Sequence, residues 1–230
     1  MHDTPPDLIA PHLRFFLDTA EVSEWETWLP TGLFYGVTCN PSLIERAGVR
    51  CHPDTLKELA QKAFSLCVKE VHLQAWGTSA ADLLHLGKIL GSADPRVVVK
   101  LPATQAGTTA AKDLIQAGFP VTLTAVYRVH QALMAAALGA SYAAPYLGRI
   151  NDAGRDGRQE IATMQKAING VRSQTRLLTA SIRDVEDIPA LAAQGIDTFT
   201  FSAAIAQALF DVPATLAATA DFERAAQSMS

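Results

Sequence analysis

Lys100 stands out because it is an amine inside an otherwise apolar run, VVVKLP at residues 97–102. Such a run is typical of a strand that is buried on both faces. Burial strips an ammonium of hydration and favours the free amine. A free amine can attack a ketone to give a carbinolamine and then an iminium, which allows the adjacent C–C bond to break. The competing interpretation is that Lys100 extends to the strand end and pairs with Asp18 or another carboxylate.

Polar residues end or follow most of the predicted strands. They are Asp18, Thr38, Asn40, Gln74, Thr124, Tyr146, Arg149, Ser181 and Arg183. Since the carboxyl ends of barrel strands share one rim, we expect these side chains to surround a common site. Asp18 is the carboxylate expected to move protons between carbinolamine and iminium and to oppose the iminium charge. Its competing interpretation is a helix N-cap for residues 20–28.

Arg149, Ser181 and Arg183 follow two neighbouring predicted strands, the sixth and the seventh. Two guanidinium groups and a hydroxyl that converge on one point form a phosphate clamp. The competing interpretation for each arginine is a solvated surface charge. Their positions on adjacent strands favour the clamp, because phosphate sites in barrels prefer that side of the rim.

Short β-branched or aromatic runs alternate with longer segments rich in Ala and Leu along the whole chain. Strands are predicted at residues 14–18, 34–38, 70–74, 97–101, 121–124, 142–146, 175–180 and 198–201. Helices are predicted at residues 20–28, 53–66, 79–90, 107–117, 127–138, 158–169, 185–193 and 203–209. Eight strand–helix units without a linker predict an α/β fold, a single-domain (β/α)8 TIM barrel over residues 14–212. A doubly wound open sheet is the alternative, but no G-x-G-x-x-G follows the first strand.

The two ends of the chain are expected to lie outside the barrel. Residues 1–13 form a polar, proline-containing tail without the pattern of a signal peptide. Residues 213–230 carry one extra amphipathic helix, at 214–226, that a barrel does not need. We expect that helix to pack on a neighbour, in the same chain or in another subunit.

Composition narrows the class of protein. The 230 residues carry a net charge of −4 with a pI near 5.8, which does not suit nucleic-acid binding. No stretch approaches the roughly 20 apolar residues of a membrane span. The odd count of three cysteines and the absence of ligand spacing among the histidines argue against disulfides and a metal site. We therefore expect a cytoplasmic protein without bound metal.

The chain resembles the transaldolase/fructose-6-phosphate aldolase family over nearly its whole length. The resemblance rests on FLDTA at 16–20, GVTCNPSLI at 36–44, VVKLPAT at 98–104, TAVY at 124–127, APYLGR at 144–149 and ASIR at 180–183. It implies a class I aldolase barrel without metal or organic cofactor. The Schiff-base lysine then corresponds to Lys100, the acid/base aspartate to Asp18 and the donor-binding residue to Asn40. The phosphate-binding residues correspond to Arg149, Ser181 and Arg183. Cys39 stands where the family usually has a second Thr, and we expect little effect on the chemistry.

Two activities occur in this family, and they differ in the fate of the enamine. Transaldolases pass a dihydroxyacetone unit to an aldose phosphate, whereas the aldolases release free dihydroxyacetone. Gln74, Ala144 and Tyr146 resemble the aldolase pattern, and Gln74, Thr124 and Tyr146 could orient a water that protonates the enamine. Gly148 and Arg183 look more like the transaldolase pattern. Aldol cleavage of fructose 6-phosphate is the preferred interpretation, and transaldolase activity in the pentose phosphate pathway is the alternative.

Two expectations concern partners. The first is an alternative in which the chain is not an enzyme. It would be a barrel that binds a sugar phosphate through Arg149, Ser181 and Arg183. With the resemblance, the extra C-terminal helix implies a ring-like homo-oligomer, a pentamer or a decamer. Thr38, at the end of the second strand, is predicted to contact the substrate beside Asn40.

Overall fold

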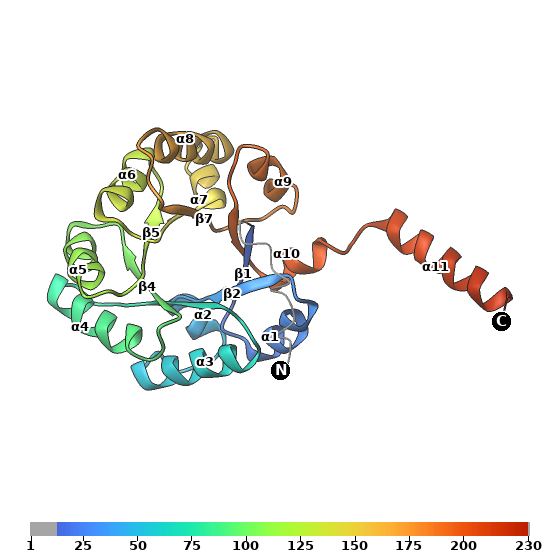
Figure 1. The fold of residues 1–230 in the computed structure, drawn as a ribbon, viewed down its shortest axis with the longest axis horizontal. Helices are drawn as coiled ribbons and strands as arrows, with labels where there is room; N and C mark the ends of the chain where they lie inside the picture. Colours follow the sequence, from blue (N-terminus) through green and yellow to red (C-terminus); the bar gives the residue numbers. More distant parts are fainter. Residues whose placement is uncertain (1–12, 230) are drawn as a thin grey trace, which may run out of the picture.

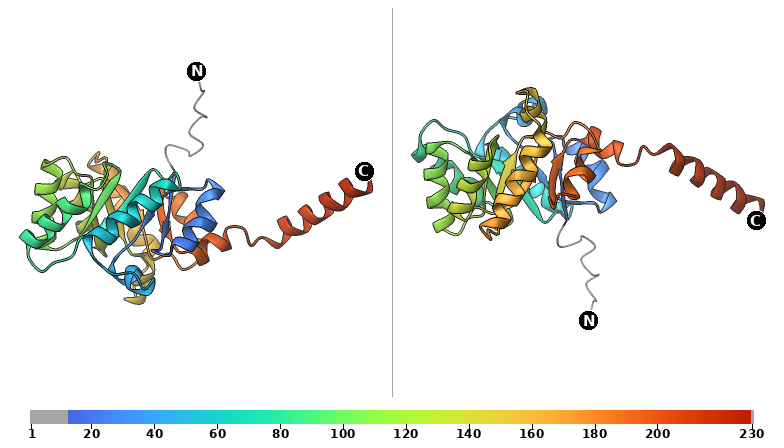
Figure 2. Two further views of the ribbon diagram at one scale, coloured as in Figure 1. Left: turned by 90° about the horizontal axis from the view of Figure 1, so that it is seen from below. Right: turned by 90° about the horizontal axis from the view of Figure 1, so that it is seen from above.

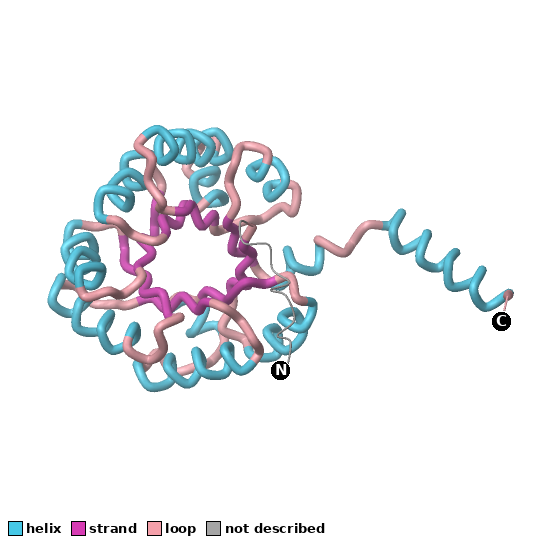
Figure 3. The backbone as a smooth tube through the Cα atoms, viewed as in Figure 1, coloured by secondary structure: helices cyan, strands magenta, loops and turns pink. Residues whose placement is uncertain are grey.

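A computed structural model describes residues 13–229, and in it eight parallel strands close into a barrel. The strands are β1 (Arg14–Asp18), β2 (Phe34–Thr38), β3 (Glu70–Gln74), β4 (Val97–Pro102), β5 (Val121–Val126), β6 (Tyr142–Pro145), β7 (Arg176–Thr179) and β8 (Thr198–Phe201). They pair in sequence order, and β8 returns to β1. Figure 3 shows this ring of strands inside a ring of helices. The expected (β/α)8 TIM barrel is confirmed, and the open doubly wound sheet is excluded.

Helices cover the outside of the ring (Figure 1). They are α1 (Val22–Trp28), α2 (Pro41–Arg46), α3 (Pro53–Ser65), α4 (Ala80–Gly91), α5 (Gln105–Gln116), α6 (Val129–Leu138), α7 (Leu147–Asp152), α8 (Gly157–Gly170), α9 (Asp187–Ala192) and α10 (Ala203–Ala208), with a 3-10 turn η1 (Leu29–Thr31) after α1. The predicted helices all occur, with ends shifted by one or two residues. The short helices α2 and α7 and the turn η1 are additions to the prediction. Within residues 13–229, no helix is both long and apolar enough to cross a bilayer.

Strand β4 explains why Lys100 points into the barrel. Side chains alternate along a strand, and Val97, Val99 and Leu101 pack outward into the core between strands and helices. Val98 points inward and joins a small cluster inside the ring with Phe16 and Leu178. Lys100 is two residues beyond Val98, so it also points inward, one layer nearer the carboxyl ends of the strands.

The last helix, α11 (Pro213–Ser228), leaves the body of the molecule. Figures 1 and 2 show it projecting beyond the barrel after α10. None of its residues is buried, and Leu216 and Phe222 are 59% and 71% exposed. Of the two expected neighbours, the same chain therefore buries no residue of this helix, and packing on another subunit stays a prediction. The predicted tail lies outside the described residues, apart from Leu13.

Candidate functional site

A cavity of about 580 Å³ opens at the carboxyl ends of the strands. It is lined by Asp18, Asn40, Pro41, Ser42, Leu43, Arg46, Gln74, Lys100, Ala125, Tyr127, Tyr146, Arg149, Ala180, Ser181 and Arg183. Eight of the ten predicted site residues are on this wall. The other two, Thr38 and Thr124, lie behind it. Most of the residues predicted to share one rim therefore line a single cavity.

Lys100 forms the floor of the cavity. Its residue is only 4% exposed, and its Nζ donates a hydrogen bond to the carbonyl oxygen of Cys39 at 3.1 Å. Among residues 13–229, no carboxylate lies within ion-pair distance of this amine. The interpretation of Lys100 as the partner of a carboxylate is therefore wrong. A buried amine with a single carbonyl partner keeps one side open to a ligand in the cavity.

Asp18 is held by a chain of two hydroxyl groups. The Thr38 Oγ1 lies 2.6 Å from the Asp18 Oδ1 and 2.6 Å from the Thr200 Oγ1. Thr38 is fully buried, so it positions Asp18 in this structure, and its predicted contact with substrate stays a prediction. The helix after β1 begins at Val22 with Glu21 as its N-cap, so the interpretation of Asp18 as a helix cap is wrong.

Gln74, Thr124 and Tyr146 form the uncharged part of the site. The Thr124 Oγ1 lies 2.8 Å from the Tyr146 hydroxyl, which anchors that phenol from behind. Thr124 is only 1% exposed, so this contact is shielded from water. Gln74 pairs with Lys100 in the register of β3 and β4, and its amide makes no hydrogen bond with the described part of the chain. The amide is therefore available to a ligand.

Asn40 both caps a helix and lines the cavity. Its Oδ1 accepts a hydrogen bond from the Leu43 backbone N–H at 3.1 Å and caps α2, and Pro41 occupies the first helical position. The cap leaves the amide nitrogen of Asn40 as a donor on the cavity wall. The Asn-Pro pair is a signal for a helix start, but no helix was predicted here.

Arg149, Ser181 and Arg183 come together as predicted, because α7 packs closely on the loop after β7. The Gly148 N–H donates to the Ser181 carbonyl at 2.9 Å. A Cβ on Gly148 would lie 2.7 Å from that oxygen and 2.6 Å from the Arg183 Nε, so only glycine allows this approach. Arg183 donates both terminal nitrogens to Asp152 at 2.6 Å. The guanidinium of Arg149 lies 5.4 Å from the centre of the Tyr146 ring.

Two cavity residues have left-handed backbone geometry without being glycine. Ala125 has φ 58° and Ser181 has φ 60°. Each such residue costs about 1–3 kcal/mol and persists only where its surroundings impose it. Ala125 lies inside β5, where its pairing with β6 shifts register between Leu123 and Val126, and Ser181 lies in the rim loop after β7. Two of the four non-glycine residues with positive φ in the described part of the chain thus line the cavity, while Cys67 and Arg172 do not.

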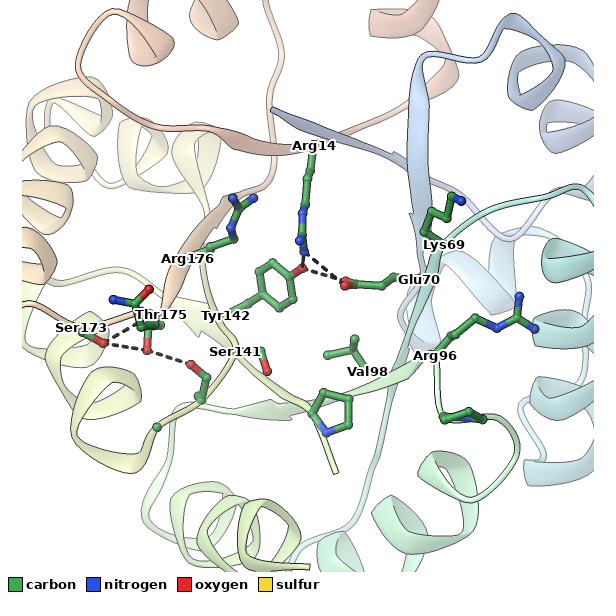
Figure 4. A pocket seen from close by; sticks show the side chains of 15 residues that line it. Arg14, Lys69, Glu70, Arg96, Val98, Ser141, Tyr142, Ser173, Thr175 and Arg176 are labelled. Carbon is green, nitrogen blue, oxygen red and sulfur yellow. Dashed lines mark hydrogen bonds and ion pairs between the residues drawn. The ribbon is translucent and has the colours of Figure 1, made fainter. Parts of the chain in front are cut away.

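The opposite end of the barrel holds a second cavity, of about 560 Å³ (Figure 4). There the Arg14 guanidinium donates to the Glu70 Oε1 at 3.2 Å and to the Tyr142 hydroxyl. The Tyr142 hydroxyl donates to the Glu70 Oε2 at 2.7 Å. These groups fill the mouth with paired charges. In barrels, this end contributes to stability and the other end carries the chemistry.

His72 extends this polar network into the barrel interior. Its Nε2 lies 3.3 Å from the Glu70 Oε2 and its Nδ1 lies 3.1 Å from the Thr122 Oγ1. Complete burial lowers the pKa of His72 below its ordinary value, although Glu70 opposes the shift. A neutral imidazole that donates to Glu70 and accepts from Thr122 satisfies both contacts. This network could not be predicted, because the period-2 pattern does not distinguish an inward His from an outward one.

The sequence interpretation missed several lining residues, including Ser42, Leu43, Arg46 and Tyr127. All of them follow strand ends. Ser42, Leu43 and Arg46 lie on the short helix α2, which was not predicted, and Tyr127 lies in the loop between β5 and α6, although a helix was predicted from residue 127. The fold itself recurs in a distant structure, the thiamine phosphate pyrophosphorylase from Pyrococcus furiosus, with a TM-score of 0.59 and 13% identity, covering 83% of this chain and 86% of that one. At this identity the likeness shows the fold alone.

Sequence comparison is more specific. The model of the Transaldolase/Fructose-6-phosphate aldolase family matches residues 15–230. The chain belongs to this family. A "Probable transaldolase" of Geobacillus kaustophilus is 32% identical over 203 residues, which cover 88% of this chain and 93% of the relative. A "Probable transaldolase 2" of Listeria monocytogenes is 34% identical, covering 88% and 91%.

Membership of the transaldolase/fructose-6-phosphate aldolase family makes the chain an enzyme of the class I aldolase/transaldolase type. The non-catalytic sugar-phosphate-binding barrel is therefore set aside. The family match spans all the strands from β1 onward except the first residue of β1, and thus the whole cavity.

Proposed function

We propose that the enzyme cleaves fructose 6-phosphate into dihydroxyacetone and glyceraldehyde 3-phosphate through a Schiff base on Lys100. The observation that supports this best is the set of uncharged groups beside Lys100: the Thr124–Tyr146 hydrogen bond of 2.8 Å and the unpaired Gln74 amide. These groups suit the placement of a water molecule that gives a proton to the enamine. Lys100 supplies the electron sink, so the proposal requires neither metal nor organic cofactor.

Lys100 begins the reaction by attacking the C2 ketone of the substrate. The carbinolamine loses water to give an iminium, and Asp18 carries the proton that this exchange requires. Asp18 then accepts the proton of the C4 hydroxyl while the C3–C4 bond breaks. Glyceraldehyde 3-phosphate leaves, and the electron pair of the broken bond remains as an enamine on Lys100.

The enamine takes a proton at C3 and becomes an iminium again. We assign the delivery of this proton to a water held by Gln74, Thr124 and Tyr146. Hydrolysis of the iminium then releases dihydroxyacetone and restores the amine. Arg149 and Ser181 bind the phosphate, with Arg183 beside them, and Asn40 donates to a hydroxyl of the three-carbon unit.

Transfer of the three-carbon unit to an aldose phosphate is the second candidate. It is favoured by the names of the relatives, which are probable transaldolases. The two activities share every step up to the enamine. They differ only in whether a proton or an aldehyde reaches C3 first.

Release of free dihydroxyacetone distinguishes the candidates. The enzyme is incubated with fructose 6-phosphate, with and without erythrose 4-phosphate, and free dihydroxyacetone is measured over time. We expect multiple turnovers of release without the acceptor. Release limited to one equivalent per site, with sedoheptulose 7-phosphate formed only when the acceptor is present, would contradict the aldolase proposal.

We also propose that α11 packs on another copy of the chain in a pentamer or decamer. Leu216 and Phe222 are largely exposed on a helix that buries none of its residues, which is an unfavourable arrangement for an isolated subunit. Light scattering gives the mass of the full chain and of a variant truncated after Val212. We expect an oligomer that dissociates on truncation, and a monomeric full chain would refute the proposal.

A further inference from the structure

Thr200 carries a buried hydroxyl to which the reaction described above assigns no role. It belongs to β8, the strand that closes the ring against β1. Phe199 and Phe201 pack outward into the core, so Thr198 and Thr200 point into the barrel. Thr200 is only 2% exposed, and its Oγ1 lies 2.6 Å from the Thr38 Oγ1. Among residues 13–229, Thr38 is the only hydrogen-bond partner of this hydroxyl.

The direction of these hydrogen bonds follows from the number of protons available. An ionised carboxylate only accepts, so the single proton of the Thr38 hydroxyl goes to the Asp18 Oδ1 at 2.6 Å. The Thr38 oxygen is then the acceptor of the second contact, and Thr200 supplies its proton. The reverse direction would bury the Thr200 proton without an acceptor among residues 13–229, which is unfavourable. Thr200 therefore donates to Thr38, and Thr38 donates to Asp18.

This direction gives the two oxygens of Asp18 different tasks. Oδ1 accepts the Thr38 proton, whereas Oδ2 has no hydrogen-bond partner within residues 13–229. Asp18 lines the cavity, so Oδ2 is the oxygen that remains for proton exchange with a ligand there. A hydroxyl that itself accepts a hydrogen bond donates more strongly, because the two bonds polarise each other. Thr200 thus strengthens the hydrogen bond that holds Asp18.

We infer that Thr200 is a positioning residue for Asp18, which acts by keeping Thr38 a donor to Oδ1. Asp18 then carries each transferred proton on Oδ2. When Oδ2 takes the proton of the C4 hydroxyl, the electron pair of the C3–C4 bond moves into the enamine on Lys100. Oδ1 remains an acceptor in both protonation states of Asp18, so the hydroxyl chain does not have to reverse during turnover.

The inference rests on the proposed function, in which Asp18 moves protons while the iminium forms and the C3–C4 bond breaks. Both steps are common to aldol cleavage and to transfer of the three-carbon unit, so Thr200 serves either activity. Thr200 does not line the cavity, and its effect on the reaction passes through Thr38.

A double-mutant cycle separates this role from simple packing. The rate of glyceraldehyde 3-phosphate formation is measured in single turnovers, with enzyme in excess over fructose 6-phosphate. The proteins are the unaltered enzyme, Thr38→Val, Thr200→Val and the double variant. Valine has nearly the shape of threonine but lacks the hydroxyl, and Thr200→Ser keeps the hydroxyl without the methyl group. Thr198→Val is the matched control, because Thr198 lies on the same strand and face but donates to Asp197 at the other end of the barrel.

We expect Thr200→Val to slow cleavage by about two- to fivefold. Thr200→Ser and Thr198→Val should keep the rate of the unaltered enzyme. In the Thr38→Val background, Thr200→Val should have no further effect, because Thr200 acts only through Thr38.

Four results would overturn the inference: an unchanged rate in Thr200→Val, an equal fall in Thr198→Val, no recovery in Thr200→Ser, or single effects that multiply in the double variant. Failure of the Schiff-base proposal would appear separately, as the absence of a borohydride-trapped adduct between the unaltered enzyme and fructose 6-phosphate.

Discussion

Removal of the Tyr146 hydroxyl is the most specific test of the proposed protonation of the enamine. Tyr146→Phe removes one of three groups assigned to the protonating water and deprives Thr124 of its 2.8 Å partner. Proton transfer by a positioned group contributes about 10²–10⁴-fold to a rate. Because Gln74 and Thr124 remain, we expect release of dihydroxyacetone to fall by about ten- to a hundredfold. The loss of a partner for buried Thr124 should also lower the free energy of unfolding by about 1–3 kcal/mol.

The assay compares two rates on the same enzyme preparation: release of free dihydroxyacetone, and formation of sedoheptulose 7-phosphate when erythrose 4-phosphate is present. Transfer does not need the protonating water, so Tyr146→Phe should raise the ratio of transfer to release by about tenfold or more. Tyr127→Phe is the matched control, because it removes a phenol hydroxyl from the same wall, 5.7 Å between ring centres from Tyr146. Rates that fall in parallel, or an equal shift in Tyr127→Phe, would refute the reasoning.

Three further predictions concern groups behind and beside the cavity. Thr38→Val removes the hydroxyl that holds Asp18 at 2.6 Å, so kcat should fall by about tenfold while KM changes little, as steady-state kinetics will show; a change in KM alone would contradict this role. Gly148→Ala places a methyl group 2.7 Å from the Ser181 carbonyl, so KM for fructose 6-phosphate should rise by about tenfold, while borohydride trapping with unphosphorylated dihydroxyacetone persists. His72 has a pKa in the folded protein below its ordinary value of 6.5, so the unfolded chain takes up the proton first as the pH falls. The contribution of neutral His72 to stability is therefore complete above pH 6.5. It is lost as the pH falls toward the folded pKa, by up to about 1.4 kcal/mol per pH unit. Urea unfolding at a series of pH values should show this slope, and a His72→Phe variant that keeps it would refute the assignment.

The barrel and the position of Lys100 could be predicted because both depend on local patterns. Apolar runs of strand length alternate with helical segments, and the closed parallel sheet brings every strand end to one rim. The inward direction of Lys100 follows from its spacing to Val98, since side chains alternate along a strand. Eight of the ten predicted site residues therefore reached the cavity wall.

The remaining features depend on contacts between distant segments. Thr38 lies at a strand end, but only the packing of β1, β2 and β8 turns its hydroxyl to Asp18 and Thr200. Helices α2 and α7 have six residues each, too few for a helical period to be visible. The direction of α11 could not be predicted either. Its apolar residues indicate that the helix packs on a partner, but they do not identify the partner surface.

Borohydride trapping shows directly whether Lys100 forms a Schiff base with the substrate. The enzyme is incubated with fructose 6-phosphate, reduced with borohydride and digested, and the adduct is located by mass spectrometry. We expect a reduced sugar adduct on the peptide that contains Lys100, and its absence in Lys100→Met. An enzyme that cleaves the substrate without any adduct, or with the adduct on another lysine, would contradict this expectation.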